Sequence, residues 1–136
     1  MRISIFGLGY VGCVSLGCLA NNGHEVIGVD VSAFKVDLIN KGIPTILEKN
    51  VDQLIKEGHE KGRISATLCA DEAVLNTDIS IICVGTPSSD HGHLNLSYIF
   101  KTAEQIGAAL KEKDSFHIIV IRSTVLPGTN RRFSRI

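Results

Sequence analysis

Gly7, Gly9 and Gly12 form the pattern G-x-G-x-x-G, whose glycines let a backbone approach a phosphate group closely. The pattern follows the β-prone residues 3–6 and precedes an apolar stretch that runs to Asn22, so a strand and a helix should flank it. We expect Gly7 to permit a tight turn, Gly9 to let the backbone approach a pyrophosphate, and Gly12 to let the helix pack close to the strand. The N–H groups and dipole of the helix N-terminus would bind the anion without Lys or Arg in the loop. The spacing therefore predicts a dinucleotide site.

An acidic residue follows the second predicted strand. Residues 26–29 are β-prone, and Asp30 ends this segment eighteen residues after Gly12. Its carboxylate can accept hydrogen bonds from both hydroxyls of an adenosine ribose and would repel a 2′-phosphate, which favours NAD over NADP. The alternative is that Asp30 is only a turn or helix-start residue before Ser32. Lys35, one helical turn further on, could contact the ribose or a phosphate, or could simply be solvated.

Length and composition limit the class of protein. The chain has 136 residues, enough for one domain, and its 44% hydrophobic and 21% charged residues are typical of a globular protein. Fourteen Lys and Arg balance fourteen Asp and Glu, so no net charge would attract nucleic acid or an acidic membrane. The residues after the predicted domain, 130–136, form a basic tail with three arginines, which we expect to be solvated.

The cysteines and the apolar amino terminus bear on location. Four cysteines occur without a C-x-x-C pair, which favours free thiols in a reducing cytoplasm over disulfides or a zinc site. Residues 3–20 carry no charge and resemble a signal peptide or a membrane span in that respect. Neither of those explains the glycine spacing, so we expect a cytoplasmic protein without a membrane partner.

The elements that must position these residues alternate between strands and helices. Strands are predicted over residues 3–6, 26–29, 64–68, 79–84 and 117–121, and helices over residues 10–22, 32–41, 51–61, 71–76 and 99–110. This alternation is typical of the α/β class, and right-handed crossovers would give a doubly wound, Rossmann-type parallel sheet of order 3-2-1-4-5 with helices on both faces. Residues 1–129 would form this dinucleotide-binding domain. Ligands of such sheets bind at the carboxyl ends of the strands, next to the loops that begin at residues 84 and 122.

Four motifs occur in a distinctive order: GLGYVG, GHEVIGVDV, ICVGTPSS and IRSTVLPGT. Together they resemble the N-terminal domain of the nucleotide-sugar 6-dehydrogenases, the family of the UDP-glucose and GDP-mannose dehydrogenases. The resemblance covers residues 1–129 and is greatest to the GDP-mannose branch, with a UDP-sugar branch as the alternative. It implies NAD as cofactor and oxidation of a sugar C6 alcohol through an aldehyde and a thioester on a catalytic Cys. GDP-mannose and two NAD would give GDP-mannuronate and two NADH, for a bacterial polysaccharide such as alginate.

The resemblance also implies which residues contact NAD. The matching positions lie in the glycine loop, after the second strand, and after the fourth and fifth strands: Tyr10, Val11, Asp30, Lys35, Thr86 and Thr124. The family's threonine at the position of Thr124 lies near the reacting centre and could orient the water that hydrolyses the thioester. The alternative is that the Thr124 hydroxyl only caps the end of a strand. For a general G-x-G-x-x-G loop, FAD is an alternative cofactor.

The chain departs from the family pattern in two loops. The family's Glu-Pro-Gly-Leu reads EKNV at residues 48–51, without the Pro and Gly that shape that turn. His91 and His93 replace a more acidic segment, and without a third ligand nearby we expect them to face solvent and not a metal ion.

The chain ends before the positions of the family's catalytic Cys, its sugar-nucleotide domain and its dimerisation helix. Cys13 and Cys18 fall in the apolar first helix, Cys69 lies far from the centre of the sheet, and Cys83 is expected mid-strand, so we expect no nucleophile among them. The chain would be the NAD-binding portion of such an enzyme, incomplete by itself. The alternatives are a stand-alone NAD-binding module, and a second chain that supplies the missing half. An uncovered edge at the fifth strand also suggests a homodimer.

Overall fold

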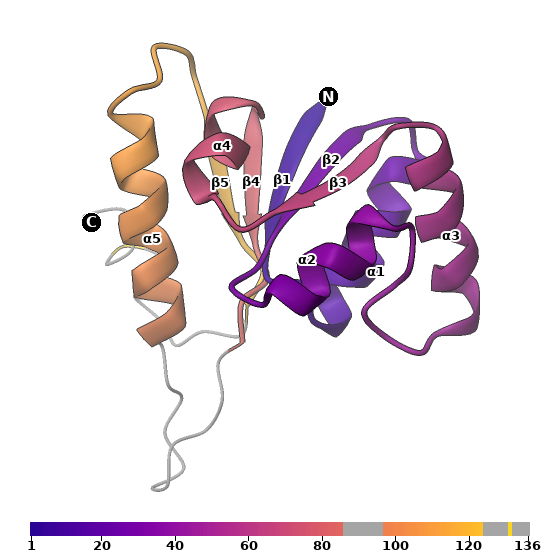
Figure 1. Cartoon of the computed structure of the whole chain (residues 1–136). Helices are drawn as coiled ribbons and strands as arrows, with labels where there is room; N and C mark the ends of the chain where they lie inside the picture. Colours follow the sequence, from indigo (N-terminus) through magenta and orange to yellow (C-terminus); the bar gives the residue numbers. More distant parts are fainter. Residues whose placement is uncertain (86–96, 124–130, 132–136) are drawn as a thin grey trace, which may run out of the picture.

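Five parallel strands form one sheet of order β3-β2-β1-β4-β5, as the crossover rule predicts (Figure 1). The computed structural model describes residues 1–85, 97–123 and 131. Along the chain the elements are β1 (Arg2–Phe6), α1 (Tyr10–Asn21), β2 (Glu25–Val29), α2 (Ala33–Asn40), α3 (Lys49–Glu60), β3 (Ile64–Thr67), α4 (Ala70–Leu75), β4 (Ile79–Ile82), α5 (Ser97–Leu110) and β5 (Ile118–Ile121).

Helices cover both faces of the sheet because successive strand residues point to opposite sides. On β1, Ile3 and Ile5 belong to a core formed with α1, α2 and α3, whereas Phe6 belongs to a second core formed with α4 and α5. Figure 1 shows α3 beside the β3 end of the sheet and α5 beside the β5 end. No helix in the described part of the chain is long and apolar enough to cross a membrane.

Most element boundaries follow the predicted signals. Ser32 caps α2 by accepting a hydrogen bond from the Lys35 N–H at 3.3 Å, and Gly42 follows this helix with φ +78°. The stripe predicted on α5 is buried at Ile99, Ala103 and Ile106.

Several boundaries differ from the prediction by one or two residues, and backbone hydrogen bonds explain two of these differences. Helix α3 begins at Lys49, two residues early, because the Glu48 carbonyl already accepts from the N–H groups of Val51 and Asp52. Strand β4 ends at Ile82 and not at residue 84, because Arg122 and Ser123 both donate their N–H groups to the Ile82 carbonyl. The hydrogen-bond ladder between β4 and β5 therefore ends at this point, and the residues that follow each strand lie at the edge of the sheet.

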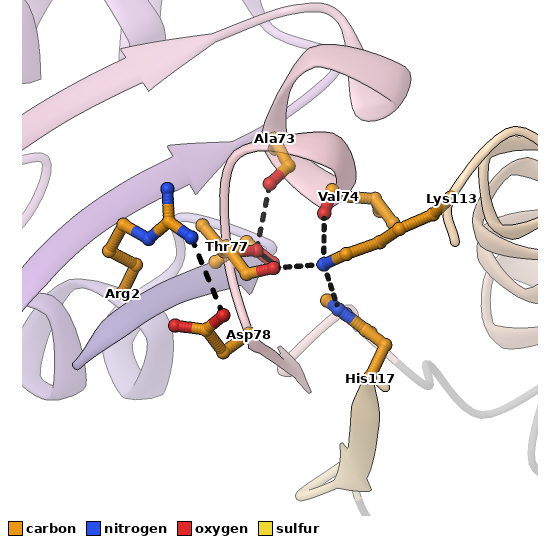
Figure 2. Close-up of polar contacts among 8 residues, drawn as sticks. Arg2, Ala73, Val74, Thr77, Asp78, Lys113 and His117 are labelled. Atoms are coloured by element: carbon orange, nitrogen blue, oxygen red, sulfur yellow. Dashed lines mark hydrogen bonds and ion pairs between the residues drawn. The ribbon is translucent and has the colours of Figure 1, made fainter. Parts of the chain in front are cut away.

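A buried polar network connects β1, β4 and β5 at their amino ends. Ser4, Thr77 and Ser80 are fully buried, and the Ser4 and Ser80 hydroxyls lie 2.7 Å apart across paired strands. Ser80 Oγ lies 2.8 Å from Nε2 of His117, and Lys113 Nζ lies 2.9 Å from Nδ1 of the same ring. Figure 2 shows Lys113 reaching the backbone oxygens of Val74 and Thr77 as well.

The lysine determines the direction of the hydrogen bonds in this network. An ammonium group only donates, so Nδ1 of His117 accepts from Lys113 and the ring is neutral. The proton on Nε2 then points to Ser80, whose hydroxyl can donate onward to Ser4. Burial and the charge of Lys113 lower the pKa of His117, which keeps this arrangement at neutral pH.

Candidate binding site at the strand ends

A cleft of about 760 Å³ opens at the carboxyl ends of the strands, a size typical of small-molecule sites. We call it the strand-end cleft. Its lining comes from the glycine loop, the end of β2, the start of α2, one face of α5, and the segments after β3, β4 and β5. The lining residues are Phe6, Gly7, Gly9, Tyr10, Val11, Val29, Asp30, Val31, Lys35, Leu68, Cys83, Val84, Gly85, Tyr98, Lys101, Thr102, Gln105, Arg122 and Ser123. The glycine loop and Asp30 thus open onto one cavity.

Gly7 and Gly12 allow the backbone to fold tightly on itself. Gly7 has φ +99° and donates its N–H to the Val29 carbonyl at 2.8 Å, and a Cβ at this position would lie only 2.7 Å from the Cys83 carbonyl oxygen. A Cβ at Gly12 would lie 1.7 Å from the Gly7 carbonyl oxygen. The start of helix α1 therefore lies directly against the turn that follows β1. Both Gly7 and Gly12 must be glycine for this approach.

Gly9 meets a different requirement, because its free space belongs to the cleft. A Cβ there would meet no atom of the protein within 4 Å, and the backbone (φ −80°, ψ −155°) suits any residue. Gly9 is the N-cap of α1 and provides no side-chain cap, and the first turn contains no acidic residue. The first N–H groups of a helix have no partner within the helix, so this end of α1 can bind an anion that enters the cleft.

Asp30 joins the glycine loop to the turn that precedes α2. One carboxylate oxygen accepts from the Leu8 N–H at 2.8 Å, and the other accepts from the Ser32 N–H at 2.9 Å. A carboxylate offers about four lone-pair sites, so each oxygen can accept a further hydrogen bond from a ligand. The turn role expected as the alternative is therefore present, and Asp30 also lines the cleft.

Positive charge predominates among the charged residues that line the cleft. Among the described residues that line it, Lys35 from α2, Lys101 from α5 and Arg122 after β5 outnumber the single carboxylate of Asp30. Together with the N-terminus of α1, this distribution favours a ligand that carries negative charge at its centre, as a pyrophosphate does.

One face of α5 takes part in the site although the sequence did not predict it. Tyr98, Lys101, Thr102 and Gln105 line the cleft. Their spacing of three, four and seven residues is that of one helical face, and this is the signal that the sequence contains. A solvated charged face has the same appearance in a sequence, so the spacing alone does not indicate a site.

Cys83 was expected inside β4 but follows the end of that strand, because the strand is two residues shorter than predicted. It lines the cleft beneath the glycine loop. Burial raises the pKa of its thiol against the opposing effect of Arg122, which favours the protonated, weakly nucleophilic form at neutral pH. The other three cysteines lie elsewhere: Cys13 and Cys18 in α1, and Cys69 at the start of α4.

Several sequence predictions concern residues outside the described part of the chain. These are Thr86, Thr124, His91, His93 and the tail 130–136 apart from Arg131. Gly85 and Ser123, the neighbours of the two threonines, do line the cleft. Among the described residues, no group of three or more His, Cys, Asp or Glu side chains could hold a metal ion.

Comparison with known protein families gives one consistent result. The family model described as "UDP-glucose/GDP-mannose dehydrogenase family, NAD binding domain" matches residues 1–136. The chain is 56% identical over 129 residues to GDP-mannose 6-dehydrogenase of Pseudomonas aeruginosa, covering 95% of this chain and 30% of that enzyme. It is 39% identical over 137 residues to UDP-glucose 6-dehydrogenase of Rhizobium meliloti, covering 100% of this chain and 31% of that enzyme.

Solved structures agree with these relatives. A ternary complex of GDP-mannose dehydrogenase from Pseudomonas aeruginosa superposes with a TM-score of 0.96 at 54% identity, over 98% of this chain and 30% of that one. A UDP-glucose dehydrogenase from Pyrobaculum islandicum superposes with a TM-score of 0.92 at 35% identity, over 98% and 32%. The chain therefore spans about 30% of the length of the curated relatives it matches.

Proposed function

The chain belongs to the UDP-glucose/GDP-mannose dehydrogenase family, as its NAD-binding domain, and on this premise we propose that it holds NAD for the oxidation of GDP-mannose. The observation that carries the proposal is the strand-end cleft, where the glycine loop, the N-terminus of α1 and Asp30 converge. Gly9 leaves open the space that a pyrophosphate would take, so the residues present suit the cofactor.

Each part of the cleft has a proposed role toward NAD. The first N–H groups of α1, at Tyr10 and Val11, would bind the pyrophosphate. Asp30 would accept from the adenosine ribose, with Lys35 beside it. Thr86 and Thr124 would lie at the nicotinamide half, where Thr124 could orient a water molecule. NAD supplies hydride acceptance at this end when it is bound.

The complete reaction is a proposal about a larger assembly. Oxidation of GDP-mannose to GDP-mannuronate needs a sugar-nucleotide site and a catalytic Cys. In the relatives, both would lie in the part of the enzyme that this chain does not match. The higher identity to GDP-mannose enzymes, 56% against 39% for the UDP-glucose enzyme, supports GDP-mannose over a UDP-sugar. A stand-alone NAD-binding module is the second candidate, and the raised pKa of the Cys83 thiol supports it because no described thiol at the cleft is activated.

Cellular context and assembly are also proposed. Free cysteines and the NAD cleft support a cytoplasmic location. Strand β5 supports a homodimer, because Ile118 and Val120 are each 43% exposed on the sheet face opposite α5.

Titration calorimetry with NAD, NADP and GDP-mannose, combined with NADH absorbance, tests the proposal. We expect NAD to bind more tightly than NADP, GDP-mannose to show no binding, and no NADH to form. Absence of NAD binding by the folded chain at millimolar cofactor would refute the proposal. Formation of NADH from GDP-mannose would instead reject the stand-alone module and show that this chain contains the reacting groups.

A further inference from the structure

Leu8, at the centre of the glycine loop, is bonded to protein through both of its backbone groups, the N–H of the Gly7–Leu8 peptide and the carbonyl of the Leu8–Gly9 peptide. The Leu8 N–H donates to Asp30, as described above, and the Leu8 carbonyl oxygen accepts from the Thr45 hydroxyl at 2.7 Å. Thr45 lies 37 residues away in sequence, in the connection between α2 and α3. This residue is not among those predicted to contact NAD, and it does not line the cleft itself.

Planarity of the peptide bond transmits the effect of Thr45 to Gly9. In a trans peptide the C=O and N–H groups point in opposite directions, so a carbonyl directed at Thr45 leaves the Gly9 N–H directed away from it. Gly9 lines the cleft. The Thr45 hydroxyl therefore holds the carbonyl side of a peptide whose Gly9 N–H lies on the opposite side, at a residue that lines the cleft.

The connection that carries Thr45 is itself anchored at both ends. It starts from a closed helix end, where Gly42 and Ile43 donate their N–H groups to the Ile39 and Leu38 carbonyls of α2. Ile46 then packs against the core under α1, α2 and α3. Because the connection is anchored, the Thr45 hydroxyl can hold the glycine loop in place. A donor on an unanchored connection would move with the glycine loop.

A second contact joins the same connection to the start of α1. The hydroxyl of Tyr10, one residue beyond the N-cap Gly9, donates to Glu48 at 3.4 Å. This bond is long and exposed, so Thr45 provides the stronger of the two contacts.

We propose that Thr45 is a positioning residue for the phosphate-binding loop, which holds the Leu8–Gly9 peptide in the orientation that receives a pyrophosphate. The inference rests on the proposed binding of NAD. Loss of the hydroxyl should weaken ligands that contain a diphosphate and leave the nucleoside part of the site unchanged. The net value of one hydrogen bond corresponds to a change of roughly fivefold to tenfold in affinity.

The test compares Thr45→Val, which keeps the shape but removes the hydroxyl, with Thr45→Ser, which keeps the hydroxyl. NAD, ADP and adenosine are titrated into each 136-residue chain. We expect Thr45→Val to bind NAD and ADP roughly fivefold to tenfold more weakly and adenosine as before, and Thr45→Ser to bind all three within roughly twofold of the unsubstituted chain. The amide NMR signals of Leu8 and Gly9 should move in Thr45→Val and return in Thr45→Ser.

The outcomes separate this inference from the proposed function. If the unsubstituted chain binds no NAD, the proposed function is wrong and the inference falls with it. If that chain binds NAD but Thr45→Val binds NAD and ADP equally well, or loses adenosine to the same extent, the inference alone is wrong. Should Thr45→Val not fold, the NMR signals and affinities of a Thr45→Ala variant decide the question in the same way.

Discussion

Asp30 shows how one side chain can connect two parts of the fold and still line the cleft. Its two oxygens accept from Leu8 and Ser32, 22 residues before it and two residues after it. The carboxylate thus connects the glycine loop to the start of α2 before any ligand is bound. The effects of a substitution at Asp30 on stability and on the choice of cofactor must therefore be measured separately.

We expect Asp30→Ala to weaken NAD binding and to reduce the preference for NAD over NADP, because the ribose acceptor and the like charge disappear together. The same change should lower the free energy of unfolding by about 1–3 kcal/mol, because two N–H groups lose a charged acceptor. Calorimetry and denaturant unfolding measure the two effects. Asp30→Asn is the matched control, since it keeps an acceptor oxygen and should retain more of the stability while still losing the discrimination. Equal affinity of the unsubstituted chain for NAD and NADP would contradict the assignment.

His117 provides a pH-dependent contribution to stability. Its pKa is lowered by burial and by Lys113, and the opposing effects of the Thr77 backbone and Asp78 are weaker. Arg2, which is paired with Asp78 at 3.5 Å, adds positive charge nearby. An imidazolium at this position would face the Lys113 ammonium at 2.9 Å (Figure 2). Protonation therefore removes the acceptor that the lysine uses.

The sign of this effect follows from linkage. The unfolded chain binds the proton near the ordinary histidine pKa of about 6.5, whereas the folded chain binds it only at lower pH. Stability from this group is complete above pH of about 6.5 and falls as the pH drops toward the lowered folded-state pKa. Denaturant unfolding between pH 8 and 5 should show the fall, and His117→Gln should reduce its slope. His24→Gln, outside the network, should leave the slope produced by His117 in place.

At the scale of elements, the glycine loop contains two glycines, three residues apart, that are needed for different reasons. The side chain missing at Gly12 would collide with backbone of the protein, and the one missing at Gly9 would occupy the cleft. Strand β4 likewise ends where it does because Arg122 and Ser123 both donate their N–H groups to the Ile82 carbonyl, and the Ser123 hydroxyl donates to the Val84 carbonyl at 2.8 Å. The backbone after β1, β4 and β5 therefore depends on contacts among all three segments.

Substitutions at the two glycines should have opposite phenotypes. Gly9→Leu is expected to abolish NAD binding at millimolar cofactor while the unfolding midpoint stays close to that of the unsubstituted chain, because its backbone angles suit any residue. Gly12→Ala should destabilise the fold by about 3 kcal/mol, because its Cβ would meet the Gly7 carbonyl oxygen at 1.7 Å. Thermal unfolding and calorimetry measure both. Unchanged NAD affinity in Gly9→Leu would mean that the pyrophosphate lies elsewhere.

At the scale of the whole molecule, the described residues cover only one face of β5. Ile119 and Ile121 pack against the core with α5, whereas Ile118 and Val120 remain partly exposed and Phe116 just before the strand is 83% exposed. An apolar strand at the edge of a sheet can pair with another chain. The proposed homodimer uses this part of the sheet.

Sedimentation across a range of concentrations should therefore show association of the unsubstituted chain. Val120→Lys is expected to shift it toward monomer, because a charge on the exposed face of β5 would be desolvated in the contact. Leu47→Lys is the matched control, since Leu47 is fully exposed and lies in the connection before α3. A monomer at all concentrations, or equal effects of the two lysines, would contradict a contact through β5.

The sequence by itself determined the architecture and the edge of the sheet where the cleft opens. Alternating strands and helices with right-handed crossovers led to the order 3-2-1-4-5, and the glycine spacing predicted the tight turn that follows the first strand. These inferences succeed because strand and helix patterns are local. The roles of Thr86 and Thr124 stay predictions, since they rest on the family resemblance.

Only the tertiary structure decided which distant residues meet. Thr45 reaches Leu8, one face of α5 lines the cleft, and Lys113 orients His117. The end of β4 differs from the prediction for a similar reason, because a partner strand ended it and not its own apolar run. Spacing along a chain describes one element at a time. The packing of elements against one another determines which donors and acceptors converge, and no pattern within a single segment records it.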